Sequence, residues 1–232
     1  MSGLLIVQTG TTSLHGGYPA WFAHAIGFPM PVVRAHEGEK LQPAIEKIKP
    51  RGIIVTGSPL SVTDAADWMA PLGDDLLRAG ERGIHVLGVC FGHQLIAQAA
   101  GGRVVRNPRG REIGTVRVRL TDEGRRDPLF SWSDEPEIEV QATHEDAVDP
   151  LPPGATLLAS NENCAVQAYR LSPTIACVQF HPELSTIAMR DLIYSRREKL
   201  IAEGRDPIAL AKGVRDVRAG EILRKFEQSS LQ

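Results

Sequence analysis

The sequence predicts an α/β fold, in which a doubly wound, mainly parallel sheet is flanked by helices. Apolar segments of strand length alternate with helical patterns over residues 4–99, and this alternation is typical of a parallel sheet with helices on both faces. Residues 103–120 and 136–181 hold several short β segments, which indicate extra antiparallel strands. Helical patterns over residues 186–230 indicate a helical C-terminal tail.

The first half of the chain contains four strand–helix pairs. Each predicted strand is a short apolar segment, as expected for strands buried on both faces. The strands are Leu4–Val7, Val32–Ala35, Gly52–Thr56 and Ile84–Val89. The helices that follow them are Pro19–Ile26, Pro43–Ile48, Asp67–Gly80 and Phe91–Ala99. Because such sheets bind ligands at the carboxyl ends of their strands, we expect the functional site there.

The C-terminal tail contains three predicted helices, Thr186–Ala202, Asp206–Arg218 and Glu221–Glu227. Gly204 and Pro207 are stop and restart signals between the first two. Neither a repeat nor a low-complexity linker interrupts the sequence. We therefore expect a single domain over residues 1–232, with a core over about 3–190 and a helical extension over about 186–230.

Composition and charge exclude several classes of protein. With 232 residues, 42% hydrophobic and 23% charged, the chain matches an ordinary globular protein. A formal charge of −2 argues against a dedicated nucleic-acid binder. Residues 1–8 lack the basic region of a signal peptide, and no apolar stretch approaches the roughly 18 residues of a membrane span. We expect a cytoplasmic protein with no nucleic-acid or membrane partner.

Three cysteines, Cys90, Cys164 and Cys177, occur without a Cys-x-x-Cys pair. Their odd number and wide spacing argue against a disulfide framework and a zinc site. Cys164 and Cys177 lie in strand-like segments and suit a core position. We therefore expect no metal and no cofactor.

Cys90 has the sequence context of a nucleophile. The apolar segment 84–87 runs into Gly-Val-Cys-Phe-Gly at residues 88–92, and a helical pattern follows. Glycines on each side of a reactive residue permit the sharp strand-to-helix turn called a nucleophile elbow. At a helix N-terminus the dipole and free N–H groups favour thiolate over thiol. This pattern predicts covalent cysteine catalysis.

His181 is the candidate base for Cys90. It follows the apolar segment Ile175–Phe180, which predicts a position at the carboxyl end of a strand. Residues two apart in an extended chain point the same way, so Glu183 is placed to orient the imidazole as in a Cys-His-acid triad. The alternative is a turn with an acid nearby by chance, and the upstream elbow favours the triad.

An acyl-transfer site also needs donors for an oxyanion. The elbow supplies the N–H of Phe91. The loop after the Gly52–Thr56 strand supplies a second candidate at Gly57 and Ser58. Gly-Ser-Pro is also a common turn, so this second prediction is the weaker pattern.

Other polar residues have structural as well as functional interpretations. His93 lies one turn after Cys90 on the elbow helix, and we expect it to pack away from the thiol. His144 is equally consistent with a structural hydrogen bond and with substrate contact. The segment His15–Tyr18 follows the first strand and either roofs the pocket or forms an ordinary loop. Residues 103–126 hold eight arginines, which favour a solvated β surface over an acidic docking partner.

These motifs resemble the class I (triad) glutamine amidotransferases. The resemblance rests on Gly-Val-Cys-Phe-Gly-His-Gln at 88–94, Gly-Ser-Pro at 57–59 and His-Pro-Glu at 181–183, and it covers about residues 3–190. Thr-His-Glu-Asp at 143–146 and Gly-Arg-Glu-Ile-Gly at 110–114 resemble stretches in the amidotransferase domain of GMP synthetase. The resemblance implies a flavodoxin-like fold of the amidotransferase type.

The resemblance also implies a reaction. Cys90 would attack the side-chain amide of glutamine, and His181 would pass the thiol proton to departing ammonia. Water would then release glutamate from the thioester. Gln94 and the backbone at Thr143 and Glu145 would contact the amino-acid end of the substrate.

Two positions depart from the family pattern. Gly57-Ser58-Pro59 stands where members often have Gly-Gly-Pro, and serine keeps the backbone donor while hindering a peptide flip. Glu145 replaces a glycine beside the substrate, so its carboxylate is a candidate for recognising a cationic or amino-bearing substrate.

Three functions stay open. The first is an amidotransferase or glutaminase subunit that feeds ammonia to a partner synthetase, because this chain has no synthetase domain and no phosphate-binding Gly-x-x-x-x-Gly-Lys loop. The second is a stand-alone hydrolase of γ-glutamyl amides or peptides. The third is a non-catalytic regulatory relative, which the presence of all three triad residues disfavours.

Overall fold

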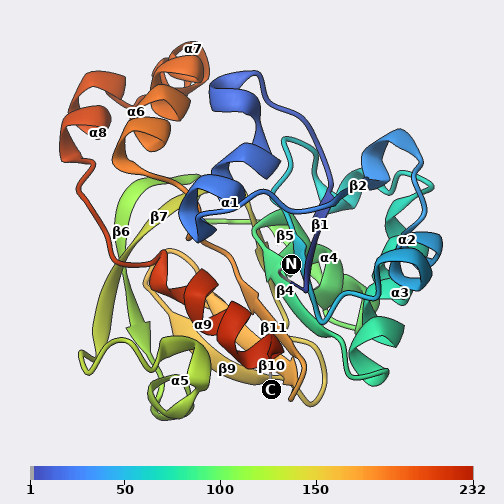
Figure 1. Ribbon diagram of the computed structural model, residues 1–232. Helices are drawn as coiled ribbons and strands as arrows, with labels where there is room; N and C mark the ends of the chain where they lie inside the picture. The colour runs from blue at the N-terminus through green and yellow to red at the C-terminus, as the bar shows by residue number, and fades with distance from the viewer. Residues whose placement is uncertain (1–2, 232) are drawn as a thin grey trace.

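The computed structural model describes residues 3–231 and is built around a nine-stranded sheet, with strand order β2-β1-β3-β4-β11-β10-β9-β6-β7 (Figure 1). Its strands are β1 (Leu4–Gln8), β2 (Val32–Arg34), β3 (Gly52–Val55), β4 (His85–Val89), β6 (Glu112–Leu120), β7 (Glu137–His144), β9 (Thr156–Ser160), β10 (Ala168–Ser172) and β11 (Ile175–Val178). A separate antiparallel pair consists of β5 (Val104–Arg106) and β8 (Asp146–Val148).

The sheet has a parallel part and an antiparallel part. Strands β2, β1, β3, β4 and β11 run parallel to one another. From β11 onward, each neighbouring pair through β10, β9, β6 and β7 is antiparallel. This confirms the predicted fold class, including the antiparallel additions from the middle of the chain.

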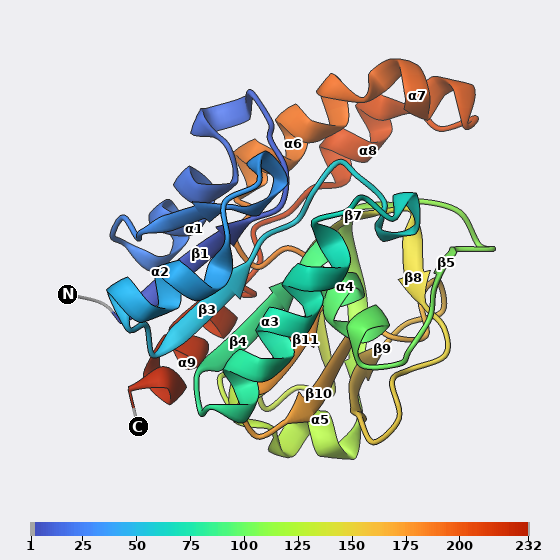
Figure 2. The same ribbon diagram turned by 90° about the vertical axis from the view of Figure 1, so that its right-hand side faces the viewer.

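Helices cover both faces of the sheet. They are α1 (Tyr18–Ile26), α2 (Leu41–Ile48), α3 (Met69–Glu81), α4 (Phe91–Ala99), α5 (Asp122–Arg126), α6 (Thr186–Ser195), α7 (Arg197–Ala202), α8 (Pro207–Gly213) and α9 (Glu221–Ser230). Short 3₁₀ turns occur at η1 (Leu14–Gly16), η2 (Ala35–Glu37), η3 (Val62–Asp64) and η4 (Pro128–Phe130). Figures 1 and 2 show α6, α7 and α8 grouped at one end of the sheet, beside α1.

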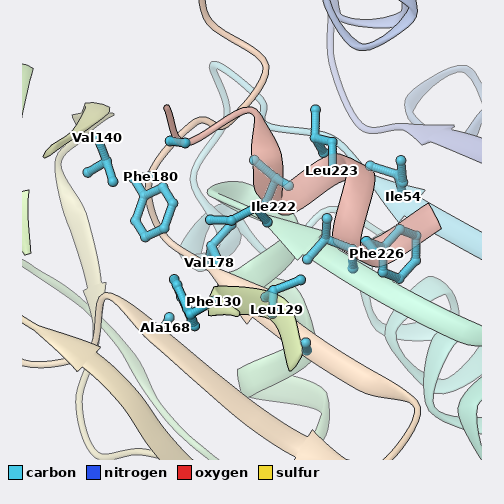
Figure 3. Close-up of a cluster of buried hydrophobic side chains, with 14 of the residues drawn as sticks. Ile54, Leu129, Phe130, Val140, Ala168, Val178, Phe180, Ile222, Leu223 and Phe226 are labelled. Atoms are coloured by element: carbon cyan, nitrogen blue, oxygen red, sulfur yellow. The ribbon is translucent and has the colours of Figure 1, made fainter. Parts of the chain in front are cut away.

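Alternate residues of the parallel strands feed two separate cores, because successive side chains of a strand point to opposite faces. Leu4 and Ile6 of β1 pack with α1 and α9, whereas Leu5 and Val7 pack with α2, α3 and α4. Figure 3 shows the first core, where Ile222, Leu223 and Phe226 of α9 lie near Ile54, Leu129 and Val178. Burial of both strand faces explains why these segments are apolar at every position.

The tail departs from its predicted helices in two places. The expected helix Thr186–Ala202 is broken at Arg196, which ends α6 and precedes α7 with φ −104° and ψ 12°. The hydroxyl of Ser195 donates to the carbonyl of Leu192 at 2.8 Å, and such side-chain bonds compete with helix continuation. The expected helix Asp206–Arg218 ends at Gly213, and the N–H of Arg215 instead donates to Thr115 of β6.

Other bounds shift by smaller amounts. The strand predicted as Ile175–Phe180 ends at Val178. The next residue, Gln179, donates its N–H to the carbonyl of Gln167, which precedes β10. The last helix is longer than predicted and reaches Ser230. Within residues 3–231, no helix is both long enough and apolar enough to cross a membrane.

Candidate active site

Cys90 lies in a sharp turn between β4 and α4. Its φ of 52° and ψ of −100° are unusual for a residue with a side chain. Its N–H donates to the carbonyl of Val178 on β11 at 2.9 Å. A Cβ at Gly88 would lie 2.8 Å from the backbone of Gly92, and one at Gly92 would lie 2.7 Å from the carbonyl oxygen of Val55. The predicted glycines are therefore required by close backbone approach.

His181 and Glu183 form a buried pair beside the elbow. The Nδ1 atom of His181 lies 2.7 Å from Oε1 of Glu183. The N–H of His181 donates to the carbonyl of Gln141 on β7, which anchors the segment after β11. Both side chains are almost wholly buried, so a dry environment strengthens their interaction.

The charge state of His181 results from opposing influences. Burial acts to lower its pKa, but the carboxylate of Glu183 and the neighbouring Cys90 outweigh burial and raise the pKa to about 10. Its Nε2 atom is buried and has no hydrogen-bond partner among residues 3–231. The imidazole can therefore exchange a proton through Nε2 while Glu183 holds Nδ1.

Gly57 shows how closely the nucleophile and the imidazole approach. A Cβ at Gly57 would lie 2.8 Å from Cε1 of His181, 3.4 Å from Cε1 of Tyr18 and 3.6 Å from Cβ of Cys90. The elbow, the segment after β11 and the loop after β3 thus meet at one point. Tyr18, at the start of α1, lies beside this point, but residues 15–18 are not in the wall of the cavity in front of Cys90.

The loop after β3 is held in one orientation by two threonines. The hydroxyl groups of Thr9 and Thr56 donate to the carbonyl of Gly57 at 3.1 Å and 2.9 Å. In a trans peptide the next N–H points away from that carbonyl, so the N–H of Ser58 is directed away from the threonines. The Ser58 hydroxyl donates to the carbonyl of Thr9 at 2.9 Å, which anchors the loop further.

A cavity of about 380 Å³ opens in front of Cys90. The predicted residues in its wall are Ser58, Cys90, Phe91, Gln94, Thr143, His144 and Glu145. Gly57, His181 and Glu183 are not part of that wall; Gly57 lies beside Cys90 and His181, and Glu183 contacts His181. A larger hollow of about 700 Å³ on β6 and β9 is lined by none of the predicted residues, so the smaller cavity is the candidate substrate site.

Gln94 presents one free atom to this cavity. Its Nε2 donates to Oε1 of Gln179 at 3.0 Å and to the carbonyl of Asp146 at 3.1 Å. With both donors engaged by the protein, the Oε1 of Gln94 is the part of the amide left to accept a hydrogen bond from a ligand.

Thr143 and Glu145 have side chains that the protein itself engages. The Cys90 sulfur lies 4.0 Å from the carbonyl oxygen of Thr143, whose hydroxyl accepts a hydrogen bond from Arg196. The carboxylate of Glu145 forms ion pairs with Arg106, Arg111 and Lys199. We expected this carboxylate to be a candidate for recognising a cationic substrate. In the structure, three cations of the chain itself already pair with it.

His144 and His93 have structural surroundings. The Nε2 of His144 lies 2.9 Å from Oε2 of Glu112, and its Nδ1 lies 2.9 Å from the carbonyl oxygen of Asp146. Of the two roles considered for His144, these contacts match the structural hydrogen bond. His93 is fully buried and its ring packs against that of Tyr169. Burial lowers the pKa of His93 to about 3, so it stays neutral.

A comparison with protein families agrees with this geometry. The family model described as glutamine amidotransferase class-I matches residues 23–197. The chain belongs to the class I glutamine amidotransferase family.

This amidotransferase-family chain is 31% identical over 157 residues to γ-glutamyl peptidase 4 of Arabidopsis thaliana, an alignment covering 67% of this chain and 61% of the relative. It is 34% identical to a glutamine-hydrolysing GMP synthase of Aromatoleum aromaticum, covering 75% of this chain and 34% of the relative. The crystal structure of a glutamine amidotransferase from Methylobacillus flagellatus superposes with a TM-score of 0.77 at 26% identity, covering 100% and 93% of the two chains. The chain thus spans less than two thirds of these two sequence relatives.

Sequence reasoning missed the basic residues of the candidate site. Arg106, Arg111, Arg196 and Lys199 all line the cavity. Arg106 and Arg111 belong to the arginine-rich segment that was expected to form a solvated surface, and the Gly-Arg-Glu motif was the available signal for Arg111. Nothing in the sequence pattern marks Arg196, because it enters the site only through the break between α6 and α7.

The described part of the chain shows no group of three or more His, Cys, Asp or Glu side chains placed to hold a metal ion.

Proposed function

We propose that this chain hydrolyses the γ-amide of glutamine to glutamate and ammonia through a thioester on Cys90. The observation that carries the proposal is the pairing of His181 with Glu183 at 2.7 Å, with the free Nε2 of His181 beside the elbow. A base held through one nitrogen and free at the other suits proton transfer to and from a thiol.

In the first half-reaction the Cys90 sulfur attacks the γ-carbonyl carbon of glutamine. His181 takes the thiol proton and delivers it to the departing nitrogen, so that the C–N bond breaks and ammonia leaves. In the second, His181 takes a proton from water, the hydroxide oxygen attacks the thioester, and the C–S bond breaks. Glutamate leaves and Cys90 regains its proton from His181.

The oxyanion of each tetrahedral intermediate is assigned to the N–H groups of Ser58 and Phe91. The threonine contacts to the Gly57 carbonyl support this assignment, because they orient the Ser58 N–H before substrate binds. We assign the Oε1 of Gln94 and the backbone at Thr143 and Glu145 to the amino-acid end of the substrate. No cofactor is required for this chemistry.

The ammonia acceptor in this proposal is a partner synthetase. Support comes from the similarity to a GMP synthase whose name includes glutamine hydrolysis. The aligned region covers 34% of that relative.

A second candidate is a stand-alone γ-glutamyl peptide hydrolase that uses the same triad. Two observations support it, and the pairing of His181 with Glu183 disfavours the third candidate, a non-catalytic relative. The cavity of about 380 Å³ is larger than departing ammonia needs and extends to the cations of the tail. A relative named γ-glutamyl peptidase aligns with two thirds of the chain.

Release of ammonia and glutamate by the purified chain tests both proposals. Glutamine and a panel of γ-glutamyl amides and peptides are offered to the wild type and to Cys90→Ala. Loss of the nucleophile should lower turnover by about 10⁵-fold or more. Cys164→Ala is the matched control, because burial raises the pKa of Cys164 to about 12 and keeps that thiol out of the chemistry.

The substrate panel separates the two candidates. Slow cleavage of glutamine alone indicates a subunit that needs its synthetase, whereas fast turnover of one substituted γ-glutamyl compound indicates a hydrolase. Activity retained in Cys90→Ala, or absent from the wild type on every substrate, would contradict the catalytic assignment.

A further inference from the structure

Arg196 occupies an unusual position in the cavity. It lies at the break between α6 and α7, where its backbone leaves the helical conformation. Its guanidinium donates to the hydroxyl of Thr143, and no carboxylate within residues 3–231 forms an ion pair with it. Arg196 and Cys90 line the same cavity. Burial lowers the pKa of Arg196, whereas the neighbouring Tyr18 and Cys90 act to raise it.

The nearby carboxylates are already engaged by other groups. Glu145 pairs with Arg106, Arg111 and Lys199. Glu203 accepts hydrogen bonds from Nε and Nη2 of Arg111 at 2.9 Å each, and the same Nη2 pairs with Glu145.

The two other acids in the cavity wall lie with Ser61. Ser61 donates through its N–H to Asp64 at 3.0 Å and through its hydroxyl to Asp146 at 2.6 Å. Neither acid forms an ion pair with Arg196.

The tail side of the cavity therefore carries an excess of positive charge. Four cations, Arg106, Arg111, Arg196 and Lys199, line the cavity there, and two carboxylates, those of Glu145 and Glu203, pair with the other three but not with Arg196. Burial and the charges of Arg111 and Arg106 also lower the pKa of Lys199. A partly buried cation without a counter-ion is costly, and an anionic ligand removes that cost. A guanidinium suits a carboxylate in particular, since its planar N–H groups match the two carboxylate oxygens.

We propose that Arg196 is a specificity-determining residue that binds a carboxylate of the substrate beside Cys90. The proposal rests on the proposed γ-glutamyl hydrolysis and adds the substrate group that the tail recognises. The carboxylate has two possible sources: the α-carboxylate of the γ-glutamyl group, or the carboxylate of a departing amino acid. Thr143 positions the guanidinium for either one by accepting one of its N–H groups.

Steady-state kinetics of Arg196→Gln and Arg196→Lys test this role. Both variants keep a long polar side chain, and only the second keeps the charge. For a substrate with the recognised carboxylate, Arg196→Gln should raise KM about 10- to 100-fold with a smaller change in kcat. Arg196→Lys should recover part of that loss. Arg197→Gln is the matched control, because Arg197 is the next residue, carries the same charge and is 68% exposed.

Paired substrates identify the source of the carboxylate. Glutamine is compared with its α-carboxamide, and γ-glutamyl-glycine with γ-glutamyl-glycinamide. If Arg196 binds the α-carboxylate, glutamine α-carboxamide should bind the wild type more weakly than glutamine does. Arg196→Gln should not weaken the binding of this carboxamide further. If Arg196 binds the carboxylate of the leaving amino acid, γ-glutamyl-glycinamide should bind the wild type more weakly than γ-glutamyl-glycine does. Arg196→Gln should then not weaken the binding of the glycinamide further.

A binding measurement separates this proposal from the catalytic one. Calorimetric titration of γ-glutamyl-glycine and of glutamate into Cys90→Ala needs no turnover. In the double variant that carries both Cys90→Ala and Arg196→Gln, binding of these ligands should be about 10- to 100-fold weaker. Equal binding with and without Arg196, or no binding to Cys90→Ala, would overturn the carboxylate site. A kcat loss that is the same for every substrate would also overturn it, because Arg196 would then act on the thiol.

Discussion

His181 concentrates the chemistry of this protein at the scale of single residues. Its environment holds a proton on the ring well above neutral pH, because Glu183 and Cys90 together outweigh burial and raise its pKa to about 10. After His181 takes the thiol proton, the imidazole can therefore hold that proton at neutral pH until the leaving nitrogen accepts it. Gly57, which permits the ring to lie against the loop after β3, is part of the same arrangement.

Replacing Glu183 by Gln should lower kcat by about 10³- to 10⁴-fold, less than the loss of Cys90, because an orienting group contributes less than the nucleophile.

Glu183→Gln should also change how stability depends on pH. A pKa raised from 6.5 to about 10 in the folded state stabilises the wild type fully below pH 6.5, and this contribution disappears as pH rises through 10. The difference in Tm between wild type and Glu183→Gln should thus be largest near pH 6 and shrink towards pH 10.

Thermal unfolding followed across that pH range is the measurement. Glu198→Gln is a suitable control, because this carboxylate is 90% exposed and lies 3.9 Å from Arg197. A Tm difference for Glu183→Gln that stays constant from pH 6 to pH 10 would show that Glu183 does not raise the pKa of His181.

At the scale of elements, the site is assembled where β1, β3, β4 and β11 end. Each strand delivers one component of the site: Thr9 after β1, the Gly57 loop after β3, Cys90 after β4 and His181 after β11. Parallel strands place their carboxyl ends at the same edge, so components far apart in the sequence meet there.

Thr9→Val tests whether the threonine contacts position the Ser58 N–H. Valine preserves the shape of the side chain and removes the hydroxyl that donates to the carbonyls of Thr56 and Gly57. Since Thr56 still holds the Gly57 carbonyl, kcat should fall about 10-fold, less than the roughly 10²- to 10³-fold typical of losing an oxyanion donor outright. Turnover by Thr156→Val, an exposed position in β9, provides the control and should match the wild type. If turnover by Thr9→Val also matches the wild type, the hydrogen bond from Thr9 to the Gly57 carbonyl has no catalytic role.

At the scale of the whole molecule, α9 returns the end of the chain to the face of the sheet that α1 also covers. Phe226 packs there in the core of Figure 3 and is 3% exposed. Phe226→Ala should therefore lower the free energy of unfolding by about 3–5 kcal/mol through lost burial and a cavity. Denaturant unfolding measures this, with Ile201→Ala, 62% exposed in α7, expected to change it by less than about 0.5 kcal/mol. Equal destabilisation of both variants would contradict the packing role of α9.

Much of the molecule could be predicted from local pattern. The strands before residue 100 are apolar at every position because both of their faces are buried, and the elbow is visible because only glycines permit its backbone contacts. His181 and Glu183 could be paired from their two-residue spacing together with the upstream elbow. The single-domain organisation and the catalytic roles of these residues stay predictions, with the experiments above as their tests.

The remaining features depend on contacts between distant segments, which local pattern does not encode. The sequence by itself determined which segments carry the candidate catalytic groups, because Gly57, Cys90 and His181 each follow an apolar strand. Only the tertiary structure decided that Glu145 is neutralised by three cations, that the 186–202 helix breaks at Arg196, and that this arginine reaches the cavity. The physical reason is that strand burial and tight turns are properties of neighbouring residues. Charge compensation instead depends on side chains that folding brings together, here Glu145 after β7 with Arg106 of β5, Arg111 before β6 and Lys199 of α7.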